Sequence, residues 1–81
     1  MWYVYMLKSE GRKWFYVGST NRLEKRIVEH NSGKVKSTRF YRPLKLVFKK
    51  EFEIEKDARY YEIKVKKMRI EKEKIIKQNK G

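Results

Sequence analysis

The chain has 81 residues, which leaves room for one small domain and excludes a second domain or a large internal substrate cavity. Its 23 basic and 10 acidic side chains give a formal net charge of +13, an excess that indicates an anionic partner. The lack of cysteine excludes a disulfide framework and a thiolate zinc site, and 15% aromatic residues are too many for a disordered charged tail.

The opening residues, MWYVYML, do not look like a targeting segment. They have no basic leader and no small-residue cleavage site. No apolar run approaches the roughly 20 residues that span a bilayer. We therefore expect a cytoplasmic protein that does not engage a membrane.

Two aromatic and β-branched runs, 2–7 and 14–17, predict a β-hairpin, because polar residues and a glycine between them are typical of a turn. Once these strands pair, the phenols of Tyr5 and Tyr16 lie close together on one face. Paired aromatic residues in a hairpin are usually packing residues, so this pair alone does not indicate a catalytic site.

The next segment predicts a helix over 21–31. Side-chain oxygens in 19–21 can cap its first turn, with Glu24 as the capping-box partner, and Gly33 follows its expected end. Leu23 and Ile27, four residues apart, are expected on its buried side.

Arg26 and His30 are also four residues apart, so their side chains are neighbours on the same helix. We expect them on a face turned away from the apolar side. Such a pair can grip a phosphate with the guanidinium and move a proton with the imidazole. An ordinary solvated basic face is the alternative for the pair taken alone.

Residues 34–43 predict a basic and aromatic loop, because they have no amphipathic period and end in the only proline. Cations of such a loop can reach phosphates, while its aromatic rings can stack on bases. The alternative is a loop kept in solution by its charge, with its aromatic rings packed on the core. The candidate nucleic-acid contacts here are Lys34, Lys36, Arg39, Phe40, Tyr41 and Arg42.

Residues 44–52 alternate well enough to predict a third strand, with Leu44, Leu46 and Phe48 on one face. An apolar stripe at helical spacing then predicts a second helix over 56–68. The stripe consists of Ala58, Tyr61, Val65 and Met68.

Glu62 falls at the edge of this stripe, where the second helix passes from core to solvent. Arg59 and Lys66 lie at helical spacing from it, so an ordinary surface ion pair is the alternative to a functional carboxylate. Lys66 is a further candidate contact to nucleic acid. After the helix, 69–81 reads as a basic C-terminal helical extension or tail.

Taken in order, these segments resemble the GIY-YIG nuclease family, and in particular its short stand-alone bacterial members. Tyr3-Val4-Tyr5 and Tyr16-Val17-Gly18 stand where that family has its two tripeptides, with ten residues between them. The segment RLEKRIVEHNSGKVKSTRFYRPLKLVF is similar to stand-alone members nearly element by element, and Glu62 follows Ala58 as in the acidic helix motif of the family. Residues 2–68 carry the likeness, which also extends to the catalytic module at the start of a bacterial excinuclease and to that of some homing endonucleases.

The resemblance implies an α+β fold in ββαβα order, with a three-stranded antiparallel sheet flanked by helices, over a catalytic domain of residues 1–68. It also implies hydrolysis of DNA phosphodiester bonds with one divalent ion, Mg²⁺ or Mn²⁺, and no small-molecule cofactor. In that family's pattern Glu62 would bind the metal and Arg26 would clamp the phosphate. Tyr16 would help to deprotonate the attacking water, supported by the phenol of Tyr5, and His30 would transfer or position a proton.

Three functions are compatible with these features. The first is a metal-dependent DNA endonuclease, with a structure-selective role in DNA repair or recombination as one form of it. The second is a nucleic-acid-binding module on the same scaffold with weak or absent turnover. The third is a protein that docks on an acidic surface or a ribonucleoprotein. The sequence does not separate DNA from RNA as the ligand.

Overall fold

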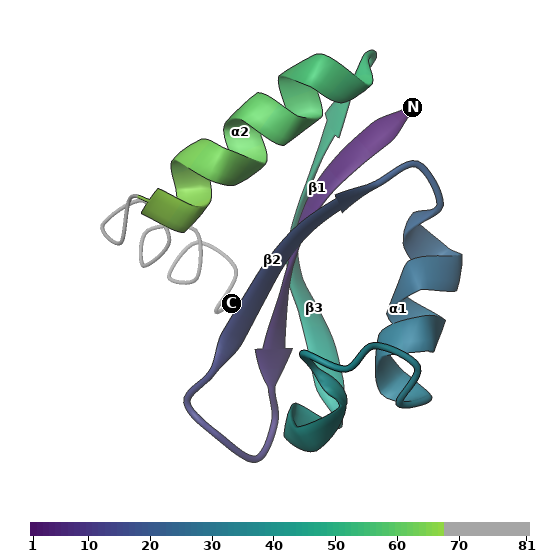
Figure 1. The fold of residues 1–81 in the computed structure, drawn as a ribbon, viewed down its shortest axis with the longest axis vertical. Helices are drawn as coiled ribbons and strands as arrows, with labels where there is room; N and C mark the ends of the chain where they lie inside the picture. The colour runs from purple at the N-terminus through teal and green to yellow at the C-terminus, as the bar shows by residue number, and fades with distance from the viewer. Residues whose placement is uncertain (68–81) are drawn as a thin grey trace.

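The computed structural model describes residues 1–67, which form the α+β fold in the order that the sequence predicts (Figure 1). The catalytic-domain boundary at residue 68 and the extension 69–81 lie outside the described residues. The elements are β1 (Trp2–Ser9), β2 (Phe15–Thr20), α1 (Leu23–Asn31), the 3₁₀-helix η1 (Arg39–Tyr41), β3 (Leu44–Phe52) and α2 (Glu55–Lys67).

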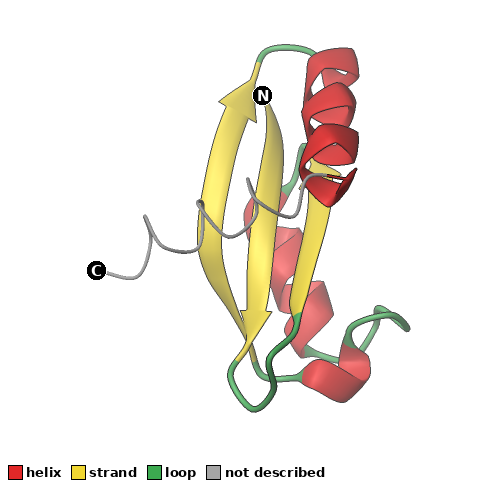
Figure 2. Ribbon diagram, turned by 90° about the vertical axis from the view of Figure 1, so that its left-hand side faces the viewer, coloured by secondary structure: helices red, strands yellow, loops and turns green. Residues whose placement is uncertain are grey.

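The three strands form one antiparallel sheet in the order β2-β1-β3, so β1 is central and β2 is an edge strand (Figure 2). Tyr5 of β1 lies opposite Gly18 of β2, and Leu7 lies opposite Tyr16. Both β1 and β2 are longer than the predicted runs, because polar residues such as Ser9 and Ser19 still pair their backbones in the ladder. The hairpin itself is confirmed.

The predicted alternation of the third strand is wrong at one point. The register between β1 and β3 shifts between Met6 and Leu7, so that Phe48 lies opposite Met6 but Leu46 lies opposite Leu7. The extra residue, Val47, is a bulge, which exchanges the faces of the residues that follow it. Leu46 therefore packs on one face of the sheet and Phe48 on the other.

The two helices cover opposite faces of the sheet (Figure 1). Successive residues of β1 point to opposite sides. Val4 and Met6 pack with Val65 of α2, whereas Tyr5 and Leu7 share a cluster with apolar residues of α1. A site that uses both helices must therefore reach around an edge of the sheet.

The first helix starts at Leu23 rather than at 21, and no side chain caps it. Thr20 instead accepts a hydrogen bond from the backbone N–H of Arg22, a turn that leads out of β2. Ser19, expected as a cap, is part of the strand. The predicted capping box is thus wrong, because the ladder with β1 holds this segment extended up to Thr20.

The second helix agrees with its predicted stripe. Ala58 and Val65 are buried and Tyr61 packs against the same cluster, while Met68 lies outside the described residues. Neither α1 nor α2, as described within residues 1–67, has the length and apolar character that a membrane crossing requires.

Candidate active site

Two tyrosines of the hairpin come together on the face covered by α1, as predicted. The ring centroids of Tyr5 and Tyr16 lie 6.1 Å apart. Gly18, opposite Tyr5 in the ladder, makes this possible, because a Cβ at this position would lie 2.7 Å from the Tyr5 hydroxyl oxygen and 2.8 Å from Cε2 of Tyr16. The third residue of the second tripeptide is therefore a glycine because the two phenols need its space.

His30 faces the sheet rather than solvent, which corrects the prediction that it points away from the apolar side of α1. It is 0% exposed, and its ring centroid lies 5.8 Å from that of Tyr5 and 4.8 Å from that of Tyr16. The reason is helical spacing: His30 lies seven residues after Leu23, which brings both to the same face of the helix. The alternative given above, an ordinary solvated basic face, is therefore excluded for His30.

A chain of hydrogen bonds runs from the sheet through His30 to the following loop. The hydroxyl of Tyr5 lies 2.8 Å from Nε2, and Nδ1 lies 2.8 Å from the Thr38 hydroxyl. That hydroxyl donates to the carbonyl of Val35, so its oxygen accepts from Nδ1–H. We assign the Nδ1–H tautomer from this network, which makes Nε2 the acceptor for the phenolic proton of Tyr5.

Burial sets the protonation states of this pair. It raises the pKa of Tyr5 above its ordinary value, and the nearby phenol of Tyr16 adds to the rise, while a side-chain hydrogen bond with Arg26 acts against it. Burial also lowers the pKa of His30 to about 4, helped by the positive charge of Arg26. At neutral pH the phenol and imidazole are therefore both uncharged.

Arg26 lies at the border of this cluster and is partly exposed. Its guanidinium pairs with Glu29 at 3.1 Å and interacts with the hydroxyl of Tyr5. The Glu29 pair is a surface ion pair three residues along the helix, which contributes little to stability. Arg26 therefore keeps a positive charge at the rim, where it can meet a phosphate.

Glu62 comes from α2, on the opposite face, and reaches the edge strand β2. Its carboxylate accepts a hydrogen bond from Ser19 at 2.5 Å and pairs with Lys66 at 2.7 Å. Only 16% of its side chain is exposed, which confirms its predicted place between core and solvent. Ser19 is the next residue after Gly18, and the negative charge of Glu62 adds to the raised pKa of Tyr5.

The structure thus brings four of the five predicted catalytic residues into one contacting cluster on the α1 side of the sheet: Tyr5, Tyr16, Arg26 and His30. Glu62 lies outside this cluster, on the α2 side of the edge strand β2. No group of three or more histidine or acidic side chains within residues 1–67 could form a complete metal cage. One carboxylate is nevertheless a suitable donor for Mg²⁺, which keeps several waters and takes further oxygens from substrate phosphates. Glu62 would be the residue that holds such an ion.

The predicted basic and aromatic loop is partly a turn of 3₁₀-helix, η1. Its two aromatic residues behave differently. Tyr41 stacks on Trp14, with centroids 3.8 Å apart and planes 7° apart, whereas Phe40 is exposed. The packing alternative therefore holds for Tyr41 alone. The four predicted cations of the loop, Lys34, Lys36, Arg39 and Arg42, all keep solvent exposure, and so does Lys66 on α2.

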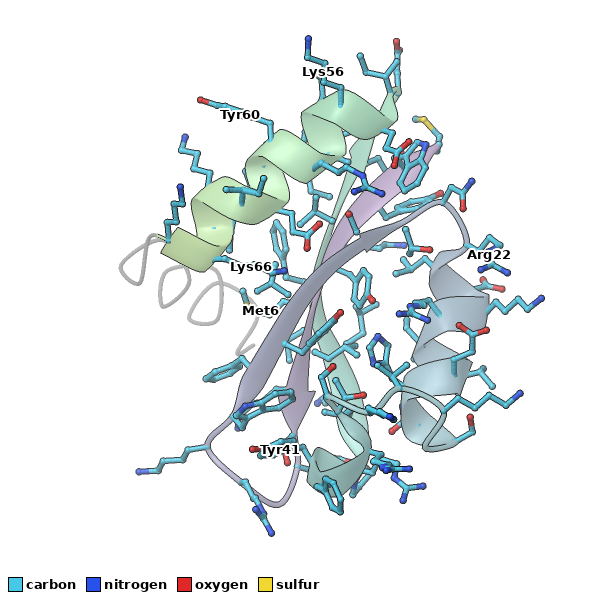
Figure 3. All side chains as sticks on the ribbon, in the orientation of Figure 1. Met6, Arg22, Tyr41, Lys56, Tyr60 and Lys66 are labelled. Atoms are coloured by element: carbon cyan, nitrogen blue, oxygen red, sulfur yellow. The ribbon has the colours of Figure 1, made fainter. Side chains whose placement is uncertain are left out.

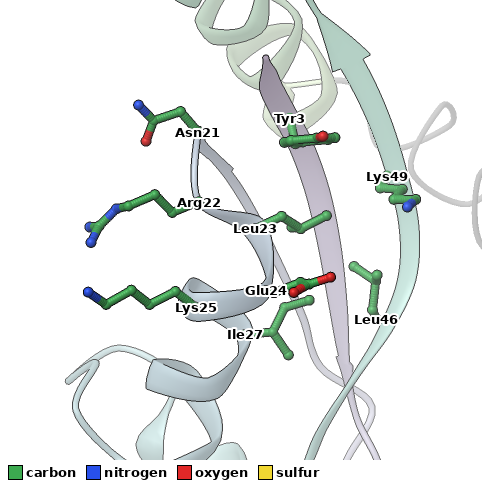
Figure 4. A pocket seen from close by; sticks show the side chains of 9 residues that line it. All are labelled: Tyr3, Asn21, Arg22, Leu23, Glu24, Lys25, Ile27, Leu46 and Lys49. Atoms are coloured by element: carbon green, nitrogen blue, oxygen red, sulfur yellow. The ribbon is translucent and has the colours of Figure 1, made fainter.

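A pocket of about 550 Å³ opens elsewhere, between the start of α1 and strands β1 and β3 (Figure 4). Tyr3, Leu23 and Lys49 are among the residues that line it, and none of the five predicted catalytic residues does. A shared concave surface for those five residues stays a prediction.

Sequence reasoning missed two residues that hold the candidate catalytic groups. Thr38 is fully buried and fixes the orientation of His30, and Ser19 binds the carboxylate of Glu62. Nothing local distinguishes Thr38 in the sequence, because its role depends on the return of the loop to α1. The sequence does hold one signal for Ser19, since it directly follows Gly18, the last residue of the second tripeptide.

The protonation of His30 predicts a loss of stability in acid. Its pKa in the folded protein, about 4, lies below the ordinary value of 6.5, so the unfolded chain takes up the proton more readily. The stabilisation is complete above about pH 6.5 and is lost as the pH falls toward 4, up to roughly 3 kcal/mol. His30 is the only histidine, so its ring signals in an NMR titration are unambiguous. Protonation near pH 6.5 in the folded protein would contradict the prediction.

Comparison with known proteins defines the class. The family model of the GIY-YIG catalytic domain matches residues 1–80, and the chain belongs to the GIY-YIG family. Membership implies nuclease-type activity on a nucleic acid, generally with a divalent metal.

Its relatives are UPF0213 proteins. The chain is 44% identical over 80 residues to the UPF0213 protein of Syntrophus aciditrophicus, covering 95% of this chain and 91% of that protein. It is 35% identical over 74 residues to the UPF0213 protein YazA of Bacillus subtilis, covering 90% and 74% of the two chains. The solution NMR structure of the UPF0213 protein BH0048 from Bacillus halodurans is similar, with a TM-score of 0.61, 34% identity, and coverage of 100% of this chain and 88% of that one.

Proposed function

We propose that this protein is a metal-dependent endonuclease that hydrolyses phosphodiester bonds in DNA. The observation that carries the proposal is the hydrogen-bonded chain from Tyr5 through His30 to Thr38, which lies beside Tyr16 and Arg26 in a GIY-YIG domain. A buried, neutral histidine bound to a phenol is costly unless every polar atom is satisfied, and here both ring nitrogens have partners.

Each residue has a role that suits its surroundings. Arg26, charged and at the rim, binds the phosphate and stabilises the charge that grows on it. Tyr16 assists removal of a proton from the attacking water, and its ring lies beside those of Tyr5 and His30. A phenol has a reference pKa of about 10, so this step depends on positive charge nearby.

His30 and Tyr5 act together. The Tyr5 hydroxyl donates to Nε2, so its remaining lone pairs are directed away from the histidine, and burial, by raising the pKa of the phenol, keeps it neutral. We assign Tyr5 the role of a supporting donor and acceptor rather than that of the base. His30 positions Tyr5, because its Nε2 accepts the hydrogen bond from the Tyr5 hydroxyl.

Glu62 is the proposed ligand for one Mg²⁺ or Mn²⁺ ion. Such an ion supplies Lewis-acid stabilisation of the phosphate and acidifies a bound water. Ser19 holds one oxygen of the carboxylate and Lys66 pairs with the other, so an ion bound by Glu62 would take the place of Lys66. Lys66 is exposed and is a proposed nucleic-acid contact, together with the cations of the loop.

The test is cleavage of plain, nicked and branched duplex DNA with and without Mg²⁺ or Mn²⁺. We expect cleavage that requires the metal and stops with a chelator. Tyr16→Phe should lower the rate by about 10²- to 10⁴-fold, the usual contribution of a positioned acid or base. Tyr60→Phe is the matched control, because Tyr60 is 74% exposed and points away from the sheet (Figure 3). Cleavage that survives Tyr16→Phe unchanged would place the activity elsewhere.

One observation favours the alternative of a binding module with weak turnover: both oxygens of Glu62 already have partners in Ser19 and Lys66. That function predicts binding that weakens steeply with salt, because neutralised phosphates release counterions. Tight, salt-sensitive and metal-independent binding, with no substrate cut, would favour it over the nuclease.

A further inference from the structure

The aromatic ring of Phe40 in η1 is exposed, although residues on both sides of it in the sequence are held in place by contacts with the rest of the domain. On one side, Thr38 is fully buried and bound to His30. On the other side, Tyr41 is stacked on Trp14, and the guanidinium of Arg12 lies 5.6 Å from the ring centroid of Tyr41. Between these anchors Phe40 is 73% exposed.

The anchors decide which ring is available to a ligand. Tyr41 has Trp14 against one side and a cation over its ring, so it offers little free surface for stacking. Phe40 has the guanidinium of Arg39 near its ring, at 5.4 Å, and Arg39 is itself exposed. A base can be gripped by an aromatic ring together with a guanidinium plane, and both are present here.

An isolated exposed apolar residue is common and by itself indicates nothing. Phe40 differs in its surroundings. Exposed cations flank it in the sequence, including Arg42, which is tied back to the carbonyl of Arg39 at 2.7 Å. A rigid ring loses little conformational freedom on binding, and positive charge around it selects an anionic partner.

We propose that Phe40 stacks on an unpaired base of the DNA substrate, which makes the protein prefer DNA with an unpaired base over a fully paired duplex. The proposal rests on the nucleic-acid-binding part of the proposed function. Thr38 contacts His30 and lies two residues before Phe40, so a base on Phe40 lies against the segment that positions the candidate catalytic histidine. A base within a paired duplex is stacked on its neighbours on both faces, so it has no free face on which the ring of Phe40 could stack.

The test measures binding without metal to two DNAs, a duplex with one unpaired 2-aminopurine and the same duplex fully paired. Alanine substitution of a stacking ring typically weakens binding to a base by roughly 5- to 150-fold. We expect Phe40→Ala to produce this loss only for the DNA with the unpaired base, together with a loss of 2-aminopurine quenching. Phe40→Trp should retain both, and Tyr60→Ala, a change at an equally exposed ring on α2, should alter neither.

Two results would overturn the proposal: equal losses for both DNAs, or no loss with Phe40→Ala. Cleavage by the wild type is measured on the same DNAs with Mg²⁺. If binding is selective and depends on Phe40 but no DNA is cut, the proposed nuclease activity is contradicted and the proposed stacking is not. If the DNA is cut but Phe40→Ala does not change binding, the proposed stacking is contradicted and the nuclease activity is not.

Discussion

Replacing Glu62 with glutamine is expected to lower the rate of DNA cleavage by about 10²- to 10³-fold, the usual effect of removing one preorganised group that stabilises transition-state charge. Glutamine keeps an oxygen that can accept from Ser19 at the same place, so the local structure should persist. It lacks the negative charge that a hard cation needs. Stability should change by less than about 1 kcal/mol, because the lost pair with Lys66 is partly exposed.

Two measurements separate this effect from damage to the fold. Calorimetric titration with Mn²⁺ should show weaker binding to Glu62→Gln, and urea unfolding should show a nearly unchanged free energy. Glu55→Gln is the matched control, since Glu55 also pairs with a cation four residues later on the same helix, in this case Arg59. Cleavage by Glu62→Gln at a rate close to that of the wild type would remove Glu62 from the site.

Replacing Gly18 with alanine is expected to damage both stability and activity. The new Cβ would lie 2.7 Å from the Tyr5 hydroxyl oxygen and 2.8 Å from Cε2 of Tyr16, closer than Cβ atoms approach other heavy atoms in real structures. The strands cannot separate without breaking their ladder, so the phenols must move. Overpacking of this kind costs about 1–3 kcal/mol. A displacement of about 1 Å in a reacting group can cost about 10²-fold in rate.

Gly11→Ala provides the control, because a Cβ at Gly11 meets no atom within 4 Å. It should change the free energy of unfolding by no more than about 0.5 kcal/mol and leave cleavage unaltered. Urea unfolding and cleavage rates of both variants test the prediction. The NMR signals of the His30 ring add a direct measure, since Gly18→Ala should disturb the bond between His30 and Tyr5. A Gly18→Ala protein as stable and active as the wild type would contradict it.

The backbone elements were largely predictable because their signals are local. A continuous apolar and aromatic run identified the hairpin, and helical spacing identified α2 to within one residue of its start. The boundaries of β2 and α1 were wrong for one shared reason: Ser19 and Thr20 have good capping side chains, but pairing with β1 keeps them extended. Local capping preference is weaker than several ladder hydrogen bonds.

The candidate site was predictable in composition but not in arrangement. Arg26 and His30 stand four residues apart, which correctly makes them neighbours. The spacing of seven residues from Leu23 places His30 on the sheet side of α1, but this spacing does not show that a polar ring is fully buried there. Its burial depends on Tyr5 and Thr38, which lie 25 and 8 residues away in the chain. A polar ring enters the interior only where distant partners satisfy both nitrogens.

The sequence by itself determined the family, the strong positive charge, and the residue types that phosphodiester chemistry requires, because these depend on composition and on the order of short motifs. Only the tertiary structure decided which side chains meet. Glu62 lies on the α2 side of the edge strand β2, whereas Arg26 lies on the α1 side. The ring of Tyr41 stacks on Trp14, while the ring of Phe40 stays exposed. Such contacts follow from the packing of two helices on opposite faces of one twisted sheet, and that packing is a property of the whole chain.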